Sequence, residues 1–172
     1  MKNNLNILHK ILLARDRREL RQKELIKRYG CSLISFTLNI PGLIKDTPLY
    51  REVHKEGMKE ILRRINGKQI DAIYKEVSYK DTGAEAFVVV DLEGLELKKI
   101  TVDIEESHSL GRIFDIDVIN KDFKSISREE IGFEQRKCLL CDEKALICKR
   151  KKTHTNDDLI EEINRLALKY FK

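Results

Sequence analysis

The sequence contains no tryptophan, and aromatic residues make up only 6% of its 172 residues. Proteins that bind single-stranded nucleic acid stack bases on aromatic side chains placed among basic ones. Here the few phenylalanine and tyrosine residues are scattered rather than interleaved with lysine and arginine. We therefore expect no nucleic-acid partner.

The sequence also lacks a long apolar run. A helix needs about 20 consecutive apolar residues to cross a bilayer, and no segment of that kind occurs. The residues after Met1 lead into a charged amphipathic stretch that has no signal-peptide apolar segment. These absences predict a cytoplasmic location and no membrane partner.

Neither sign of charge dominates. The 34 lysine and arginine residues and 29 aspartate and glutamate residues give a net charge of +5, and they are interspersed. This balance permits an anionic partner without requiring one. Repeats, linkers and low-complexity segments are absent as well. With 41% hydrophobic residues, the chain is expected to form a single domain over residues 1–172.

Hydrophobic periodicity predicts the main elements. Helices are expected over residues 4–29, 47–65 and 156–171, and strands over residues 31–39, 70–79, 85–92 and 113–119. Residues 96–107 carry a helical stripe and are interpreted as a helix, although the alternation within them equally suits a strand. Residues 123–126 are expected to pair back as a hairpin. The order predicts an α+β fold, with a mixed or antiparallel sheet flanked by helices.

Two aspartates lie on one of these predicted strands. In residues 113–119, apolar side chains alternate with Asp115 and Asp117. Alternate residues of a strand share a face, so both carboxylates point away from the core, with Cα atoms about 6.6 Å apart. Two such carboxylates can bind one Mg²⁺, which prefers oxygen ligands and leaves positions for substrate phosphates. The alternative is a solvated strand face whose aspartates pair with lysines.

Gly111 and Arg112 immediately precede this strand. A glycine allows close backbone approach to a phosphate, and an arginine offers a planar fork of donors for it. The combination with Asp115 and Asp117 is typical of phosphoryl transfer, in which Mg²⁺ neutralises charge on the transferring phosphate.

A second cluster contains three of the four cysteines. Cys138, Cys141, Cys148 and His154 are spaced C-x2-C-x6-C-x5-H, and Cys₃His is a known zinc ligand set. The second half departs from common zinc-finger spacings, so Zn²⁺ is a candidate and reduced thiols are the alternative. Redox catalysis by the first two cysteines is disfavoured, because no thioredoxin-like βαβ pattern surrounds them.

Longer motifs surround both clusters. The string IEESHSLGRIFDIDV (residues 104–118) resembles the signature of the apo-citrate lyase phosphoribosyl-dephospho-CoA transferase family, the citrate lyase holo-acyl-carrier-protein synthases. NIPGLIK (residues 39–45) and RKCLLCD (residues 136–142) match in the expected order, and residues 14–18 are similar too. One departure is Ser109, where the family pattern usually has proline, which should alter loop stiffness more than chemistry.

The resemblance implies a definite reaction, because such enzymes are similar to nucleotidyltransferases. The phosphoribosyl-dephospho-CoA group moves from triphosphoribosyl-dephospho-CoA to a serine of the citrate lyase acyl-carrier (gamma) subunit, and pyrophosphate leaves. Under this interpretation Asp115 and Asp117 bind Mg²⁺, and Arg112 contacts the triphosphate.

The remaining roles have several candidates. Further contacts to the donor are expected from Gly111, Lys45, Arg15 and Arg136. Proton transfer from the serine or completion of metal binding is expected from Glu105 or Glu106, with His108 either a general base or a hydrogen-bonding residue of its loop. A third carboxylate is expected from Asp91 or Glu85.

Two other functions remain open. The same chemistry could act on the carrier protein of malonate decarboxylase, although the cysteine-rich segment and the Glu-Glu-x-His-x-Leu-Gly-Arg string favour citrate lyase. The chain could instead be a non-enzymatic zinc module that binds protein or nucleic acid, which the scattered aromatic residues disfavour.

Overall fold

The computed structural model describes residues 2–172, with side chains from residue 6 onward. The helices are α1 (Lys2–Tyr29), α2 (Pro48–Asn66), α3 (Gly94–Ser107), α4 (Ala145–Lys151) and α5 (Asn156–Tyr170). The strands are β1 (Ser32–Leu38), β2 (Ala72–Lys80), β3 (Gly83–Val90) and β4 (Phe114–Ile119). Two 3₁₀ turns, η1 (Gly111–Ile113) and η2 (Glu129–Ile131), complete the described elements.

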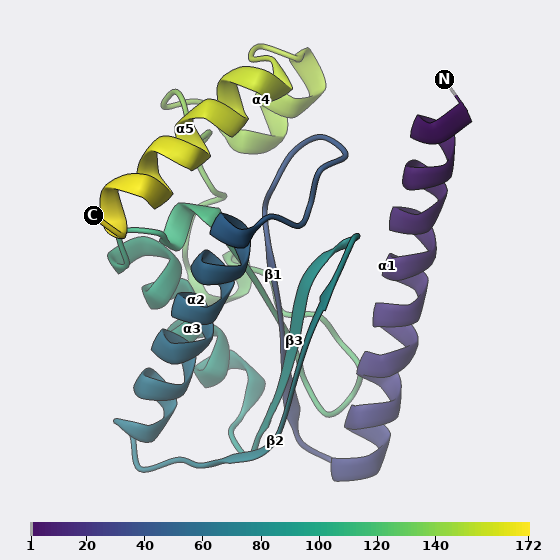
Figure 1. The fold of residues 1–172 in the computed structure, drawn as a ribbon. Coiled ribbons are helices and arrows are strands. Elements are labelled where there is room, and N and C mark those ends of the chain that lie inside the picture. Colours follow the sequence, from purple (N-terminus) through teal and green to yellow (C-terminus); the bar gives the residue numbers. More distant parts are fainter. Residues whose placement is uncertain (1) are drawn as a thin grey trace.

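The strands form one sheet in the order β2-β3-β1-β4, and every neighbouring pair is antiparallel. Helix α1 lies along one face of this sheet, whereas α2, α3 and α5 lie on the other side (Figure 1). The α+β class and the antiparallel alternative for the sheet are thereby confirmed. β4 is an edge strand, so within residues 2–172 no strand pairs with its outer backbone edge.

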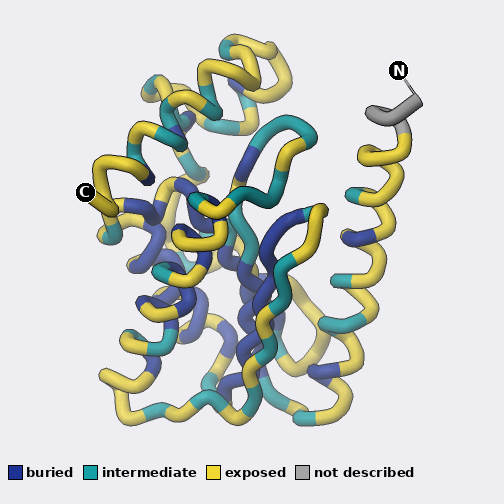
Figure 2. Tube along the Cα trace, in the orientation of Figure 1, coloured by how far each residue is buried: buried dark blue, intermediate teal, exposed yellow. Residues whose placement is uncertain are grey.

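Both faces of the sheet are buried, and they form two separate hydrophobic clusters. Ile34, Phe36 and Ile116 point into the larger cluster with residues of α2, α3 and α5. Leu33 and Phe87 point to the other face, where the C-terminal part of α1 covers them. Every residue of β3 is buried, as expected for a central strand with both faces covered. Figure 2 shows this buried interior between the helices.

Helix α1 contributes to the fold mainly through its C-terminal half. Leu25 and Ile26 are buried against the sheet, whereas Leu8 and Leu12 nearer the N-terminus are about half exposed. Gly30, with a φ of 66°, takes the left-handed conformation that ends the helix. None of the helices in residues 2–172 combines the length and apolar character needed to span a membrane.

Residues 96–107 belong to helix α3, as predicted. Leu97, Ile100 and Ile104 bury one helical stripe in the larger cluster. Residues 123–126 pair back on β4 as expected, since Ser125 forms an antiparallel bridge with Ile119 and the Ile126 N–H donates to the Val118 carbonyl at 2.9 Å, but the pairing is limited to this one bridge and no regular strand forms. The reason is the tight turn before it, in which the Asn120 side chain accepts hydrogen bonds from the N–H groups of residues 122 and 124.

Candidate active site

The two aspartates lie as the alternation predicts. Asp115 pairs with Thr37 across the sheet and Asp117 pairs with Ser35, on the face that carries α1. Their apolar neighbours on β4 point into the larger hydrophobic cluster. Thr37 donates a hydrogen bond of 3.4 Å from its hydroxyl to Asp115 Oδ2. Both carboxylates are therefore directed away from the core, on one face of a rigid strand.

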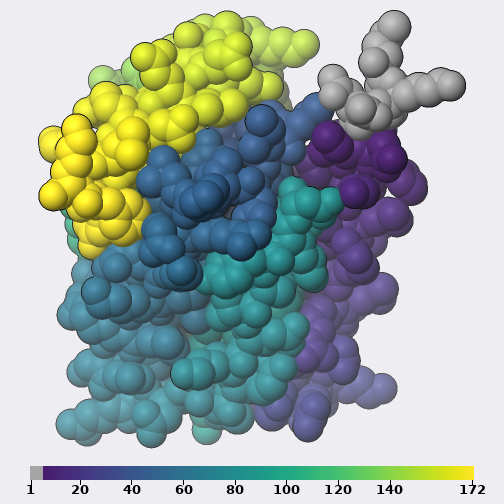
Figure 3. Space-filling model, viewed as in Figure 1, coloured from purple at the N-terminus to yellow at the C-terminus, as the bar shows by residue number. Residues whose placement is uncertain are grey.

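A cavity of about 140 Å³ opens beside Asp115. It lies where α1, the loop after β1 and the β2–β3 turn approach one another, and its lining residues are Ile11, Ala14, Arg15, Arg18, Thr37, Leu38, Asn39, Ile40, Lys45, Thr82, Gly83, Ala84 and Asp115. In the space-filling view, the C-terminal segment, this loop, the turn and α1 follow one another across the visible face (Figure 3). The fold thus brings together three predicted residues, Arg15, Lys45 and Asp115, from distant parts of the sequence.

The cavity is electropositive at one side. Burial lowers the pKa of Lys45, and the neighbouring positive charges of Arg15 and Lys149 lower it further. Lys45 Nζ also donates to the Ile40 carbonyl. A bound anion would relieve the repulsion among the three cations. Lys149 is not among the residues that the motifs single out, because it comes from α4 and only tertiary packing brings it close.

The carboxylates of Asp115 and Asp117 form a negatively charged pair beside this cavity. Asp117 is accessible to solvent, yet the protein around it desolvates the carboxylate, and this desolvation raises its pKa. The negative charge of Asp115 raises that pKa further, whereas the positive charge of Lys98 lowers it. Arg136 Nη1 lies 4.0 Å from Asp115 Oδ1. A divalent cation between the two carboxylates would remove their mutual repulsion.

Glu105 is occupied by structural contacts. It is 2% exposed and accepts a hydrogen bond of 3.0 Å from the N–H of Ile116. Its carboxylate also forms ion pairs with Arg128, at 2.5 Å, and with Arg136. Lys98 donates to the Ile116 carbonyl at 3.1 Å. These side chains hydrogen-bond to backbone groups at the outer edge of β4, and Glu105 lines the second cavity described below rather than the one beside Asp115.

Arg112 and Glu106 line a second cavity, of about 320 Å³. Arg112 Nη2 donates to the carbonyls of Lys137 and Cys138, both at 2.7 Å. Glu106 forms an ion pair of 2.6 Å with Arg128. Arg136 lines this cavity too, whereas Asp115 lines only the first. The structure therefore divides the predicted site residues between two cavities.

Gly111 has a packing explanation. A Cβ at this position would overlap the backbone carbonyl of Glu105 and lie 2.8 Å from the carbonyl oxygen of Ile104. The close approach that requires glycine is therefore to the C-terminal turn of α3. A phosphate is not needed to explain this residue.

His108 is not brought together with the aspartates. Its Nδ1 accepts a hydrogen bond of 3.0 Å from the N–H of Leu110, which orders the loop after α3. Its ring contacts the Phe114 ring, with centroids 5.2 Å apart, on the core side of β4. Burial lowers the pKa of His108. Of the two roles considered, hydrogen bonding within its own loop fits this placement.

The strand register distinguishes the two candidates for a third carboxylate. The pair Phe36–Ala86 places Glu85 beside Thr37, in the cross-strand row that contains Asp115. Asp91 follows the other end of β3, with a carboxylate oxygen 4.0 Å from Cys31 Sγ. Glu85 is 5% exposed and forms ion pairs with Arg18, at 2.8 Å, and Lys80, at 3.4 Å. Glu85 is thus the nearer candidate, although two cations already contact it.

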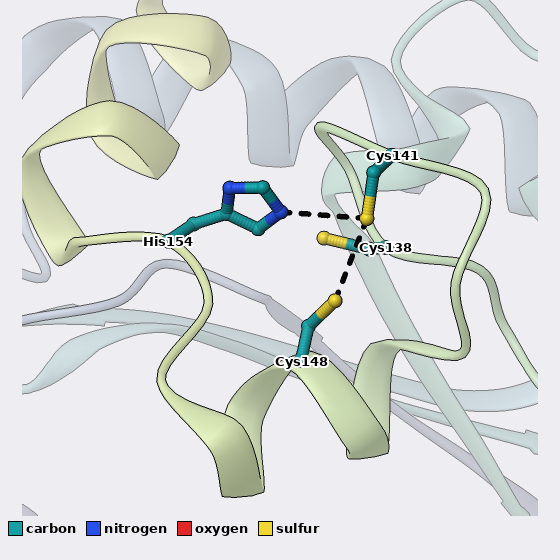
Figure 4. Close-up of side chains that lie close together, drawn as sticks. All are labelled: Cys138, Cys141, Cys148 and His154. Carbon is teal, nitrogen blue, oxygen red and sulfur yellow. Dashed lines mark hydrogen bonds between the residues drawn. The ribbon is translucent and has the colours of Figure 1, made fainter.

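The cysteine cluster is assembled in the structure. One potential ligand atom from each of Cys138, Cys141, Cys148 and His154 lies within 4.8 Å of all the others. The sulfur atoms of Cys141 and Cys148 are 3.5 Å apart, and His154 Nε2 is 3.4 Å from the sulfur of Cys141. Figure 4 shows the four side chains directed toward one another. This Cys₃His arrangement could bind a metal ion.

Comparison with known proteins gives one consistent result. A model of the family described as apo-citrate lyase phosphoribosyl-dephospho-CoA transferase matches residues 6–170. Proteins with this name from Shigella boydii serotype 18, Escherichia coli O157:H7 and Shigella sonnei are 35% identical to this chain over 157 residues, which are 91% of this chain and 85% of each relative. The chain, with its aspartate pair and cysteine cluster, therefore belongs to the apo-citrate lyase phosphoribosyl-dephospho-CoA transferase family.

Proposed function

We propose that this protein is a nucleotidyltransferase that moves the phosphoribosyl-dephospho-CoA group from triphosphoribosyl-dephospho-CoA to a serine of the citrate lyase acyl-carrier subunit. The observation that carries the proposal is the cavity in which Asp115 faces Arg15 and Lys45. A carboxylate pair beside clustered cations suits a triphosphate with its divalent cation. Family membership supports the prosthetic group and the citrate lyase acceptor.

The residues in and around the first cavity have distinct roles in this proposal. Asp115 and Asp117 bind Mg²⁺, which when bound neutralises charge on the phosphates. Arg15, Lys45 and Lys149 contact the triphosphate oxygens, and their mutual repulsion favours an anion between them. Arg112 and Arg136 act as positioning residues, because their guanidinium groups are bound to backbone carbonyls.

The transfer itself is a single displacement. The serine Oγ of the carrier forms a bond to the α-phosphorus of the donor, and the bond from that phosphorus to the pyrophosphate oxygen breaks. The serine proton passes to a basic group, and pyrophosphate leaves with the electron pair of the broken bond. The cations hold the departing oxygens, which is where negative charge develops.

The test uses Asp115→Asn and Asp117→Asn, with Asp122→Asn as the matched control. Asp122 is an exposed aspartate in the turn after β4, outside both cavities. Pyrophosphate release and the mass gain of the carrier are measured with and without added Mg²⁺. We expect each site variant to lose about 100-fold or more in rate, since electrostatic stabilisation of the transition state is lost, and the control to keep its rate. Near-normal rates in both site variants would disprove the assigned metal role.

The acceptor is tested separately. The wild-type protein is incubated with the donor and either the citrate lyase carrier or the malonate decarboxylase carrier. We expect a mass gain on the citrate lyase carrier alone. A faster gain on the other carrier would overturn the proposed acceptor while leaving the transfer chemistry intact.

A further inference from the structure

The cysteine cluster is built on a small folded module at the C-terminal end of the chain. The backbone returns on itself between Arg136 and Ala145, where the N–H of Cys138 donates to the Glu143 carbonyl at 2.6 Å and the N–H of Ala145 donates to the Arg136 carbonyl at 2.8 Å. This hairpin directs Cys138 and Cys141 toward α4.

Local backbone structure also positions the other two side chains, Cys148 and His154. Cys148 lies on α4, which ends at Lys152 with a left-handed φ of 51°. His154 comes two residues after Lys152 and directly precedes Thr155, whose side chain and that of Asp158 form a capping box at the start of α5. α5 in turn packs on the larger hydrophobic cluster through Ile163. The hairpin therefore positions the first two side chains, and the segment from α4 to α5 positions the other two.

The spacing of the ligand atoms fits a tetrahedral zinc ion. With Zn–S bonds of about 2.3 Å, two sulfur ligands of such an ion lie about 3.8 Å apart. The sulfurs of Cys141 and Cys148 are 3.5 Å apart, close to this value, and the remaining ligand atoms all lie within 4.8 Å of one another. The 3.4 Å between the Cys141 sulfur and His154 Nε2 is close to the separation of about 3.5 Å expected for a sulfur and a nitrogen ligand. Three cysteines and one histidine fill all four positions, which is typical of a structural site and leaves no position for a substrate.

We propose that Cys138, Cys141, Cys148 and His154 bind one Zn²⁺ and that this ion stabilises the module that carries Arg136 and Lys149. A hairpin and a helix of only seven residues have little stability of their own. Arg136 comes two residues before the first ligand and contacts the Phe114 carbonyl of β4 at 2.8 Å. Lys149 directly follows the third ligand and lies near Lys45. Zinc binding itself does not depend on the proposed transfer reaction.

The metal is tested first by its stoichiometry. The full chain is purified from zinc-supplemented cells without chelator, and metal content is measured by inductively coupled plasma and native mass spectrometry. We expect one Zn²⁺ per wild-type chain, one in Cys31→Ser and none in Cys148→Ser. Cys31 is the matched control, because it is the cysteine outside the cluster. Metal-free wild-type protein, or equal zinc content in Cys148→Ser, would overturn the proposal.

A second experiment does not require that a cluster variant folds. Wild-type protein is stripped of metal under reducing conditions and titrated with Co²⁺. Thiolate-to-cobalt charge transfer and visible d–d bands typical of tetrahedral coordination should appear at one equivalent, and Zn²⁺ should abolish them. Hydrogen exchange of residues 136–154 should become faster in the metal-free protein and slow again when Zn²⁺ is added. A Cys141–Cys148 disulfide in freshly purified protein, with no cobalt spectrum after reduction, would contradict the metal site.

Discussion

His54 shows how one buried side chain links the fold to pH. Its ring is fully buried and stacks on the Phe36 ring, with centroids 4.5 Å apart. Among the residues that the structure describes, neither ring nitrogen has a hydrogen-bond partner. Burial therefore disfavours the charged form and lowers the pKa of His54 to about 4 from an ordinary value of 6.5. The histidine is neutral in the folded protein at neutral pH.

Acid should consequently destabilise the protein through this residue. The unfolded chain takes up a proton near pH 6.5 and the folded chain only near pH 4, so the free energy of unfolding falls as the pH is lowered through this window. The full effect is about 3 kcal/mol. Urea unfolding between pH 7 and pH 4.5 should show a weaker pH dependence in His54→Leu than in wild type.

A control keeps this measurement specific. His9 is exposed on α1, and His9→Leu should retain the wild-type pH dependence. His108, whose pKa burial also lowers, contributes in the same direction in every variant, so the difference between variants isolates His54. Parallel curves for wild type and His54→Leu would show that His54 is not responsible.

At the scale of elements, Gly57 determines how closely α2 approaches the sheet. A Cβ at this position would overlap the Phe36 ring and lie 3.1 Å from the Phe114 ring. Both rings are fully buried, with centroids 5.5 Å apart in an edge-to-face arrangement. The helix therefore crosses β1 and β4 at a point where only a hydrogen atom fits between them.

Gly57→Ala should destabilise the protein although alanine favours helices. The gain in helix propensity is about 1 kcal/mol, whereas overpacking of a well-packed core costs about 1–3 kcal/mol. Displacement of the Phe114 ring would also disturb the backbone of β4 next to Asp115. We expect a lower urea midpoint at unchanged slope. Lys59→Ala, on the exposed face of the same helix, should stay within about 0.5 kcal/mol of wild type. A midpoint of Gly57→Ala above that of wild type would contradict the proposed close packing.

At the scale of the molecule, Glu105 joins four segments. It lies on α3, accepts from the backbone of β4 and pairs with Arg128 and Arg136, which come from the loops before η2 and before the cysteine module. The sheet edge, the second cavity and the module thus meet at one buried carboxylate. Removing one partner of a buried ion pair leaves the other uncompensated, which costs about 3–5 kcal/mol.

Glu105→Gln should therefore lower the free energy of unfolding by about 3 kcal/mol, as measured by urea denaturation. Glu106→Gln is the matched control, because Glu106 pairs with the same Arg128 but its side chain is 50% exposed. An exposed pair contributes about 0–1 kcal/mol, so this variant should be nearly as stable as wild type. Equal decreases in the free energy of unfolding of the two variants would show that burial of Glu105 does not determine the stability of these ion pairs.

The sequence by itself determined the elements and the local geometry of the aspartate pair. Helices α1, α2 and α5, the four strands and the shared face of Asp115 and Asp117 follow from periodicities of 3.6 and 2, which are properties of contiguous residues, whereas α4 was not among the predicted helices. The hairpin expected over residues 123–126 does form, but the turn stabilised by Asn120 is followed by only one bridge, between Ser125 and Ile119. Motif order was sufficient for the family resemblance, which the comparisons confirm.

Tertiary structure alone decided which residues meet. The order β2-β3-β1-β4 places Glu85, and not Asp91, in the row of Asp115. The packing of α1 and α4 brings Arg15 and Lys149 near Lys45. Arg112 instead donates to the backbone carbonyls of Lys137 and Cys138. Contacts between residues far apart in the sequence depend on strand order, strand register and helix placement. These are set by the burial of whole surfaces rather than by neighbouring residues. The aspartates could therefore be predicted from spacing, and Arg15 and Lys45 from the family resemblance, but the approach of Lys149 could not be predicted.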